Sequence, residues 1–199
     1  MPTASAPDGD EVFDRWGTMG LGHFAELGVP ADVLPIKTRE DALRYDLADR
    51  ARAASMVYCS GGKPQHAAKV LVDTPVWSAI LEALGRGAVY AGCSAGAMLA
   101  SQSKIHRDGT TRGTGWRFGL GLVPNVSFGV HWDRASKIPG VTWFMSSGIP
   151  DGSWFVGIDE RTAILGDGRE WQVHGLGSVT VRRDGQTSTR STGATFETS

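Results

Sequence analysis

The chain has 199 residues, of which 41% are hydrophobic and 21% are charged, so it is long enough to bury the core of one globular domain. A formal net charge of −1 and a pI near 6.5 leave no basic surplus for neutralising phosphates, so we do not expect a nucleic-acid partner. The sequence contains no apolar run of the roughly 18 residues that a membrane span needs, and its N-terminal stretch lacks signal-peptide features, so we expect a cytoplasmic protein and no membrane partner.

The first half of the sequence alternates helical and extended patterns. Apolar residues at helical spacing predict a helix over residues 10–28. Residues 29–38 predict a short strand. Thr38 and Asp41, three residues apart, form a capping signal that predicts a helix over residues 39–54.

The next segment continues this alternation. Residues 55–62 are a β-rich run that ends in two glycines, and residues 66–73 have a helical pattern. Thr74 and Pro75 begin a further helix. Its predicted apolar face comprises Trp77, Ile80, Leu81 and Leu84. Strands that alternate with helices predict a parallel sheet with helices on its faces, which is the α/β class.

The second half is rich in glycine and in short strand patterns. Strands are predicted around residues 126–132, 153–160, 162–166 and 170–185. These closely spaced strands indicate a more antiparallel C-terminal part. We therefore predict a single domain over residues 1–185 and a polar, loosely ordered tail over residues 186–199.

Cysteine and histidine usage gives no sign of a disulfide framework or of a metal site. Cys59 and Cys93 lie in apolar, strand-like runs, which predicts buried reduced thiols. The five histidines are scattered singly, so no metal site is expected.

One serine lies at a break between two apolar runs. Gly92, Ser94 and Gly96 fit the G-x-S-x-G nucleophile elbow, with a strand-like run before the turn and a small-residue helix start after it. Cys93 is one place off the centre of this motif, so we expect its side chain to point back into the core. The alternative is that Ser94 only caps a helix and the two glycines only permit close packing.

Several motifs in fixed order carry a family resemblance. "GGKPQHAAKVLVDTPVWSAILEALGRGAVYAGCSAGAM", "GLGLVPNVSFGVHWDR" and "GIDERTAIL" together resemble peptidase family S51, the serine peptidases that include dipeptidase E and cyanophycinase. The resemblance implies a class I glutamine amidotransferase-like α/β sandwich, with a mostly parallel central sheet flanked by helices. It also implies that Ser94 replaces the amidotransferase cysteine as the nucleophile and that no cofactor is needed.

The resemblance also assigns the base and the acid. His131 matches the catalytic histidine of the family, and a serine nucleophile needs such a base. Glu160 of the "GIDE" motif matches the acid of cyanophycinase-like members, whereas Asp108 lies where dipeptidase E has its acid. We favour Glu160 because the motif around it is intact, and we expect Asp159 to pair locally. The other four histidines, for which an ordinary structural role is favoured, are His23, His66, His106 and His174.

The oxyanion hole and the substrate site follow less closely from the family pattern. Ala95 and the pair Gly61 and Gly62 match the positions whose amides hold the oxyanion in the family. Cyanophycinase has a glutamine two places after the paired glycines, but here Pro64 holds that place. Gln65 follows it and is our candidate for substrate binding. This shift argues against cyanophycin as the substrate.

The N-terminus also departs from the family pattern. Most members begin with a strand that precedes the "PTASAP" segment, so the first strand is expected to be missing here. We expect a serine peptidase or dipeptidase that cleaves an amide bond of a small peptide through a Ser-His-Glu triad and an acyl-enzyme. The alternative is a catalytically inactive glutamine amidotransferase-like binding domain. Formation of a homodimer is left open.

Overall fold

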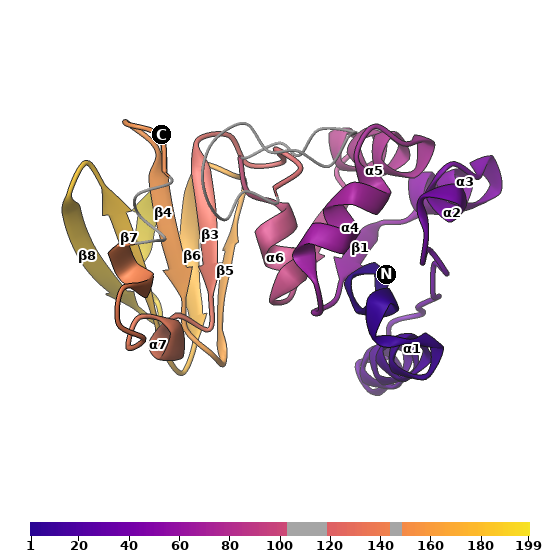
Figure 1. Ribbon diagram of the computed structural model, residues 1–199, viewed down its shortest axis with the longest axis horizontal. Helices are drawn as coiled ribbons and strands as arrows, with labels where there is room; N and C mark the ends of the chain where they lie inside the picture. Colours follow the sequence, from indigo (N-terminus) through magenta and orange to yellow (C-terminus); the bar gives the residue numbers. More distant parts are fainter. Residues whose placement is uncertain (103–118, 144–148) are drawn as a thin grey trace. The chain divides into compact units, whose positions relative to one another are not determined.

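The computed structural model of the protein describes residues 1–102, 119–143 and 149–199 (Figure 1). These residues divide into two compact units, and each is considered by itself. The first unit comprises Met1–Leu99, and the second comprises the described residues from Ala100 onward.

The first unit surrounds a parallel pair of strands with helices. The strands β1 and β2 run parallel, with Val57 opposite Tyr90 and Cys59 opposite Gly92. Its elements are η1 (Thr3–Asp8), α1 (Asp10–Glu26), α2 (Arg39–Ala42), α3 (Tyr45–Ala53), β1 (Met56–Cys59), α4 (Pro64–Leu71), α5 (Pro75–Gly85), β2 (Val89–Gly92) and α6 (Ala95–Leu99). Its fully buried aliphatic side chains include Leu47, Leu71, Val76 and Ile80.

Helix caps define the ends of these helices much as the sequence predicts. Gly28, just beyond α1, has a φ of 70°, the left-handed geometry that terminates helices. The Thr38 side chain accepts the amide of Asp41, and the Asp41 carboxylate accepts the amide of Thr38, so a complete capping box begins α2. The Thr74 hydroxyl accepts the Trp77 amide at the start of α5.

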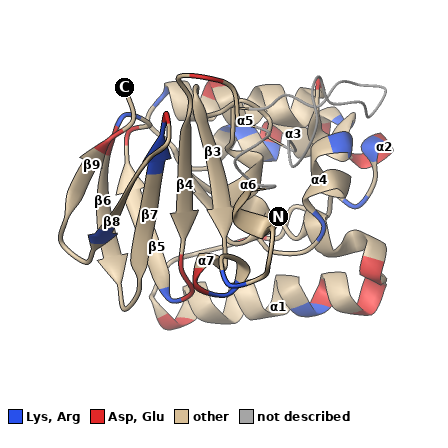
Figure 2. Ribbon diagram, turned by 60° about the vertical axis from the view of Figure 1, so that its left-hand side comes forward, with Lys and Arg blue, Asp and Glu red and all other residues tan. Residues whose placement is uncertain are grey.

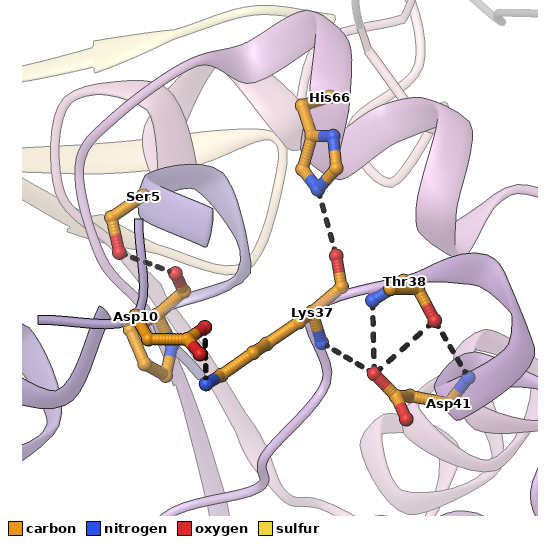
Figure 3. Close-up of polar contacts among 7 residues, drawn as sticks. Ser5, Asp10, Lys37, Thr38, Asp41 and His66 are labelled. Atoms are coloured by element: carbon orange, nitrogen blue, oxygen red, sulfur yellow. Dashed lines mark hydrogen bonds and ion pairs between the residues drawn. The ribbon is translucent and has the colours of Figure 1, made fainter. Parts of the chain in front are cut away.

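Lys37 ties three parts of the first unit together, as Figure 3 shows. Its ammonium group binds the Asp10 carboxylate at 2.8 Å, and its amide donates to Asp41 at 2.9 Å. The His66 ring nitrogen Nε2 lies 2.8 Å from the Lys37 carbonyl oxygen. His66, from the first turn of α4, therefore holds this loop, which is an ordinary structural role.

Three local predictions for this unit are wrong. Residues 29–37 form no strand, because Pro30 and Pro35 lack the amide hydrogens that a strand ladder needs. The single helix predicted over residues 39–54 is two helices, separated where Arg44 takes an extended conformation and its guanidinium pairs with Asp46 in the first turn of α3. Leu81 of α5 is 43% exposed, outside the buried face of that helix.

The N-terminal residue lies beside β1. In the described part of the chain no strand precedes η1, but the Met1 amino group donates to the Tyr58 carbonyl at 2.6 Å and the Met1 carbonyl accepts the Ser60 amide at 3.2 Å. These two bonds follow the pattern of a parallel pair. A cavity of about 470 Å³ adjoins this region, lined by α1, by residues 29–34 and by β1.

The second unit consists mainly of strands. Its elements are β3 (Val126–Val130), α7 (Trp132–Ala135), β4 (Trp154–Ile158), β5 (Thr162–Gly166), β6 (Glu170–Gly175), β7 (Ser178–Arg183), β8 (Gln186–Ser191) and β9 (Thr195–Glu197). They form a four-stranded sheet in the order β3-β4-β7-β8 and a three-stranded sheet in the order β5-β6-β9. β3 and β4 are parallel and the other pairs are antiparallel. The α/β class and the more antiparallel C-terminal part are confirmed.

The C-terminal residues differ from the loosely ordered tail expected of residues 186–199. They form β8 and β9, although their side chains are mostly polar. Phe196 is only 7% exposed and lies opposite Trp171 in the register of β6 and β9. The Trp171 indole donates to the Thr198 hydroxyl at 3.0 Å. Composition alone misses these strands because half of each strand faces solvent and tolerates polar side chains.

Charges of both signs are interspersed on the helices of the first unit, where Figure 2 shows blue and red segments close together. Arg50 pairs with Asp32, and Arg52 pairs with Glu82 at 2.6 Å. These exposed pairs contribute little to stability. Among the described residues there is no helix of the length and apolarity that crossing a membrane requires.

Candidate active site

Ser94 lies in the turn between a strand and a helix. β2 ends at Gly92 and α6 begins at Ala95, so two residues make the turn. The φ of Ser94 is 52°, in the left-handed region that a residue with a Cβ rarely occupies and that costs about 1–3 kcal/mol. The Ser94 carbonyl accepts the Met98 amide at 3.1 Å, so the strained residue also opens the helix. This is the geometry that the G-x-S-x-G motif predicts.

The two glycines of the motif are required by close backbone contacts. A Cβ on Gly92 would lie 2.5 Å from the carbonyl carbon and oxygen of Gly96. A Cβ on Gly96 would lie 2.0 Å from the Cys59 carbonyl oxygen on β1. Real Cβ atoms do not approach backbone atoms so closely. Only glycine at both positions therefore lets helix α6 start directly against the two strands.

The paired glycines that follow β1 lie beside Ser94. A Cβ on Gly61 would be 3.4 Å from the Ser94 Cβ and 3.8 Å from its Oγ. Gly62 has a φ of 136°, and a Cβ there would lie 2.3 Å from the Ala4 carbonyl oxygen. The structure thus places Gly61 next to the predicted nucleophile and holds Gly62 against η1. Ala95, the third residue of the predicted oxyanion hole, directly follows Ser94.

Cys93 does not point into the core as the sequence suggested. Its side chain is exposed, whereas Cys59 is buried as expected. Cys93 directly follows Gly92, the last residue of β2. It therefore belongs to the turn and not to the paired strands β1 and β2. Burial, with the Cys93 thiol as the second cause, raises the pKa of Tyr58 to about 12. Cys93 is thus an exposed thiol in the residue that directly precedes Ser94.

The predicted base and acid are in contact in the second unit. His131 follows β3 directly and precedes α7, with a φ of 51° and a ψ of 41°. Its ring nitrogen Nδ1 lies 3.2 Å from the Glu160 carboxylate oxygen Oε1. Glu160 follows β4, which runs parallel to β3. His131 and Glu160 therefore both follow the C-terminal ends of neighbouring strands. An acid that binds Nδ1 leaves Nε2 as the proton acceptor.

Two neighbours hold the Glu160 side chain and backbone in place. The Arg134 guanidinium binds the second carboxylate oxygen, Oε2, at 2.8 Å. The Glu160 amide donates to the Asp133 carboxylate at 3.0 Å, and this bond holds the pKa of Asp133 below its usual value. Asp159 instead accepts the amide and the hydroxyl of Ser178, which is the local pairing expected of it.

Glycines on β3 and β4 make room for the residue after His131. The Trp132 ring packs on Phe155, with centroids 4.6 Å apart. A Cβ on Gly157 would lie 2.6 Å from this indole, so only glycine leaves space for it. The Trp132 side chain is 6% exposed and anchors the start of α7. This anchor fixes the backbone from which His131 projects.

The remaining predicted residues take no part in these contacts or lie elsewhere. Gln65 is exposed in the first turn of α4, and His23 and His174 are exposed on α1 and β6. Asp108 and His106 lie outside the described residues. The sequence predicts no functional role for Arg134 and Asp133. Their place three and two residues after His131, next to the carboxylate, was their only signal.

Comparison with known proteins shows a family match that extends over most of the chain. The sequence model of peptidase family S51 matches residues 1–173. Cyanophycinases of Trichormus variabilis and of a Nostoc species are each 30% identical over 166 residues, which cover 79% of this chain and 55% of theirs. A cyanophycinase of Synechococcus elongatus is 27% identical over 184 residues. The chain thus spans about half the length of the curated relatives it matches.

Two solved structures of peptidases are similar to this chain. A peptidase from an acI-B1 actinobacterium has a TM-score of 0.86 and 29% identity, over 98% of this chain and 81% of that one. A putative peptidase E protein of Listeria monocytogenes has a TM-score of 0.57 and 18% identity, over 95% and 82% of the two chains. The second likeness concerns the fold alone.

Proposed function

We propose that this chain, which belongs to peptidase family S51, is a serine hydrolase that cleaves an amide bond of a small peptide. The observation that carries the proposal is the contact between His131 and Glu160, 3.2 Å apart, in a chain whose only G-x-S-x-G serine is held in a strained turn. A carboxylate on Nδ1 fixes the tautomer that a general base needs and stabilises the imidazolium that forms when the base takes a proton.

In the proposed reaction, Ser94 Oγ attacks the amide carbonyl as His131 Nε2 takes its proton. The carbonyl oxygen becomes an oxyanion, which the amides of Ala95 and Gly62 receive. His131 then gives the proton to the leaving amine as the C–N bond breaks, which leaves an acyl-enzyme on Ser94. Water, deprotonated by His131, attacks this ester, and His131 gives the proton to Ser94 Oγ as the C–O bond breaks and the acid is released. Glu160 stabilises the imidazolium in both halves of the cycle.

Arg134 has a supporting role in this scheme. With Oε2 of Glu160 bound to the guanidinium, the carboxylate keeps Oε1 directed at His131. We therefore expect the acid to be oriented before substrate binds.

The substrate class is proposed as a small peptide, including dipeptides with an aspartyl or β-aspartyl residue. Cyanophycinase is the name of the curated relatives, but the glutamine expected after the paired glycines is displaced to Gln65. A hydrolysis screen would compare a dipeptide library that includes Asp-X and β-aspartyl peptides with cyanophycin. Ser94→Ala is the negative variant, and Ser78→Ala, at an exposed serine of α5, is the matched control.

We expect turnover of at least one small peptide by the wild type and by Ser78→Ala, and none by Ser94→Ala. Turnover of cyanophycin alone would contradict the proposed substrate class. Equal turnover by Ser94→Ala and the wild type would contradict the proposed mechanism.

A further inference from the structure

A tyrosine on β2 reaches across the Ser94 turn. The hydroxyl of Tyr90 donates a hydrogen bond of 2.6 Å to the carbonyl oxygen of Gly96. Tyr90 lies four residues before Ser94, and Gly96 lies two residues after it, in the first turn of α6. The phenol therefore connects the strand that enters the turn with the helix that leaves it.

The surroundings of Tyr90 fix the position of its hydroxyl. The ring meets the Trp77 ring edge to face, with centroids 6.4 Å apart and an interplanar angle of 84°. Burial, and then the neighbouring Cys59 thiol, raise the pKa of Tyr90 well above its usual range. The hydroxyl accordingly keeps its proton at every pH at which the protein would be assayed, so it remains a donor to Gly96.

The backbone of the Ser94 turn, between β2 and α6, is closely packed and can move little. Ser94 has a left-handed φ of 52°, and α6 has only five residues, so few internal hydrogen bonds stabilise the helix. Gly96 packs closely on the Cys59 carbonyl, since a Cβ there would lie 2.0 Å from its oxygen, and Gly96 directly follows Ala95 in the first turn of α6. The Tyr90 hydroxyl binds the carbonyl of this same Gly96 peptide unit.

We propose that Tyr90 is a positioning residue that holds the backbone of Ser94 and Ala95 in its reactive geometry by anchoring the Gly96 carbonyl. This inference rests on the proposed function, because only a nucleophile and an oxyanion donor need such accuracy. Tyr90 touches neither substrate nor reacting atoms in this scheme. The motif G-x-S-x-G does not include Tyr90, which lies two residues before its first glycine.

The test uses Tyr90→Phe, which removes one hydroxyl and keeps the ring that contacts Trp77. The control is Thr74→Val, which also removes one buried hydroxyl. This hydroxyl donates to the Leu71 carbonyl at 2.7 Å and accepts the Trp77 amide at 3.3 Å at the start of α5. Both are measured as full chains at a temperature where both are folded. The readouts are amide hydrogen exchange over residues 92–99 and the second-order rate constant for labelling by a fluorophosphonate.

For Tyr90→Phe we expect exchange over residues 92–99 to be about fivefold faster, because a hydrogen bond of ordinary strength is lost. Labelling should be about tenfold slower, because misplaced reacting groups lose rate steeply. Thr74→Val should change both by less than about twofold while lowering stability to a similar extent. A role in stability alone would give the same labelling rate in both variants.

Two results would overturn the inference. One is unchanged exchange over residues 92–99 in Tyr90→Phe. The other is a labelling rate for Tyr90→Phe equal to that of Thr74→Val when the wild type is labelled at Ser94. If the wild type is not labelled, the proposed function fails, and the exchange measurement alone decides whether Tyr90 holds the turn.

Discussion

Ser94 and His131 share an uncommon backbone conformation. Both have a positive φ, near 52° and 51°, and both lie where a strand gives way to a helix. Such strained residues cluster at functional sites, where a side chain must be presented at the end of a strand. A positive φ is not sufficient, since Asp73 and Asp184 also have one. At these two residues it coincides with the expected chemistry.

The sequence predicted the positions of the candidate site better than its supporting contacts. Ser94 could be identified from glycine spacing, and Glu160 from the motif around it. The bond from Tyr90 to Gly96 and the pair of Arg134 with Glu160 depend on how segments fold together, so a single sequence does not reveal them.

Replacing Glu160 by Gln is expected to lower kcat by orders of magnitude with little loss of stability. Loss of the orienting carboxylate costs about 10⁴ in kcat in the well-studied serine triad, because the imidazole takes the wrong tautomer. Asp108→Asn should lower kcat less than about tenfold, because we assign the role of the acid to Glu160 and not to Asp108. Steady-state kinetics of both variants give the comparison. Loss of turnover in Asp108→Asn, with Glu160→Gln near normal, would assign the acid to Asp108.

At the scale of elements, the sequence predicted correctly those helices that begin with a clear capping residue. It was wrong for the segment over residues 29–37 and for the polar C-terminal strands. The capping residues Thr38 and Thr74 begin α2 and α5 as predicted. The segment over residues 29–37 reads as β-rich, but its prolines cannot pair. The C-terminal strands were missed because their stability comes from a few buried side chains such as Phe196.

Replacing Gly22 of α1 and Gly96 of α6 by alanine is expected to change the free energy of unfolding in opposite directions. Gly22 of α1 is exposed, and a Cβ there meets nothing within 4 Å, so Gly22→Ala should raise the free energy of unfolding by about 0.5–1 kcal/mol. Gly96→Ala places a Cβ 2.0 Å from the Cys59 carbonyl oxygen and should lower it by about 3 kcal/mol. Urea denaturation measures both. Equal effects of the two variants would contradict the backbone contact at Gly96.

The C-terminal strand β9 is expected to contribute to the stability of the second unit. Phe196→Ala removes a buried ring and should lower the free energy of unfolding by about 3 kcal/mol, as other buried aromatic truncations do. Thr195→Ala, at the neighbouring exposed position, is the control. Denaturant unfolding followed by tryptophan fluorescence suits this test, since Trp171 lies opposite Phe196. A loosely ordered tail would give the same small effect for both variants.

At the scale of the whole molecule, the candidate machinery is divided between the two units. The first unit supplies Ser94 with the glycine amides, and the second supplies His131 with Glu160. The match to peptidase family S51 over residues 1–173 extends across both. That these residues act in one mechanism stays a proposal, and it comes from the family resemblance and not from periodicity or composition.

The most direct test of the account is where a fluorophosphonate attaches to the native protein. Peptide mapping by mass spectrometry, on the wild type and on Ser94→Ala and Cys93→Ala, identifies the modified residue. We predict that the label attaches to Ser94 in the wild type and in Cys93→Ala, and that Ser94→Ala is not labelled. Labelling of Ser94→Ala as strong as that of the wild type, or attachment to another residue, would contradict it.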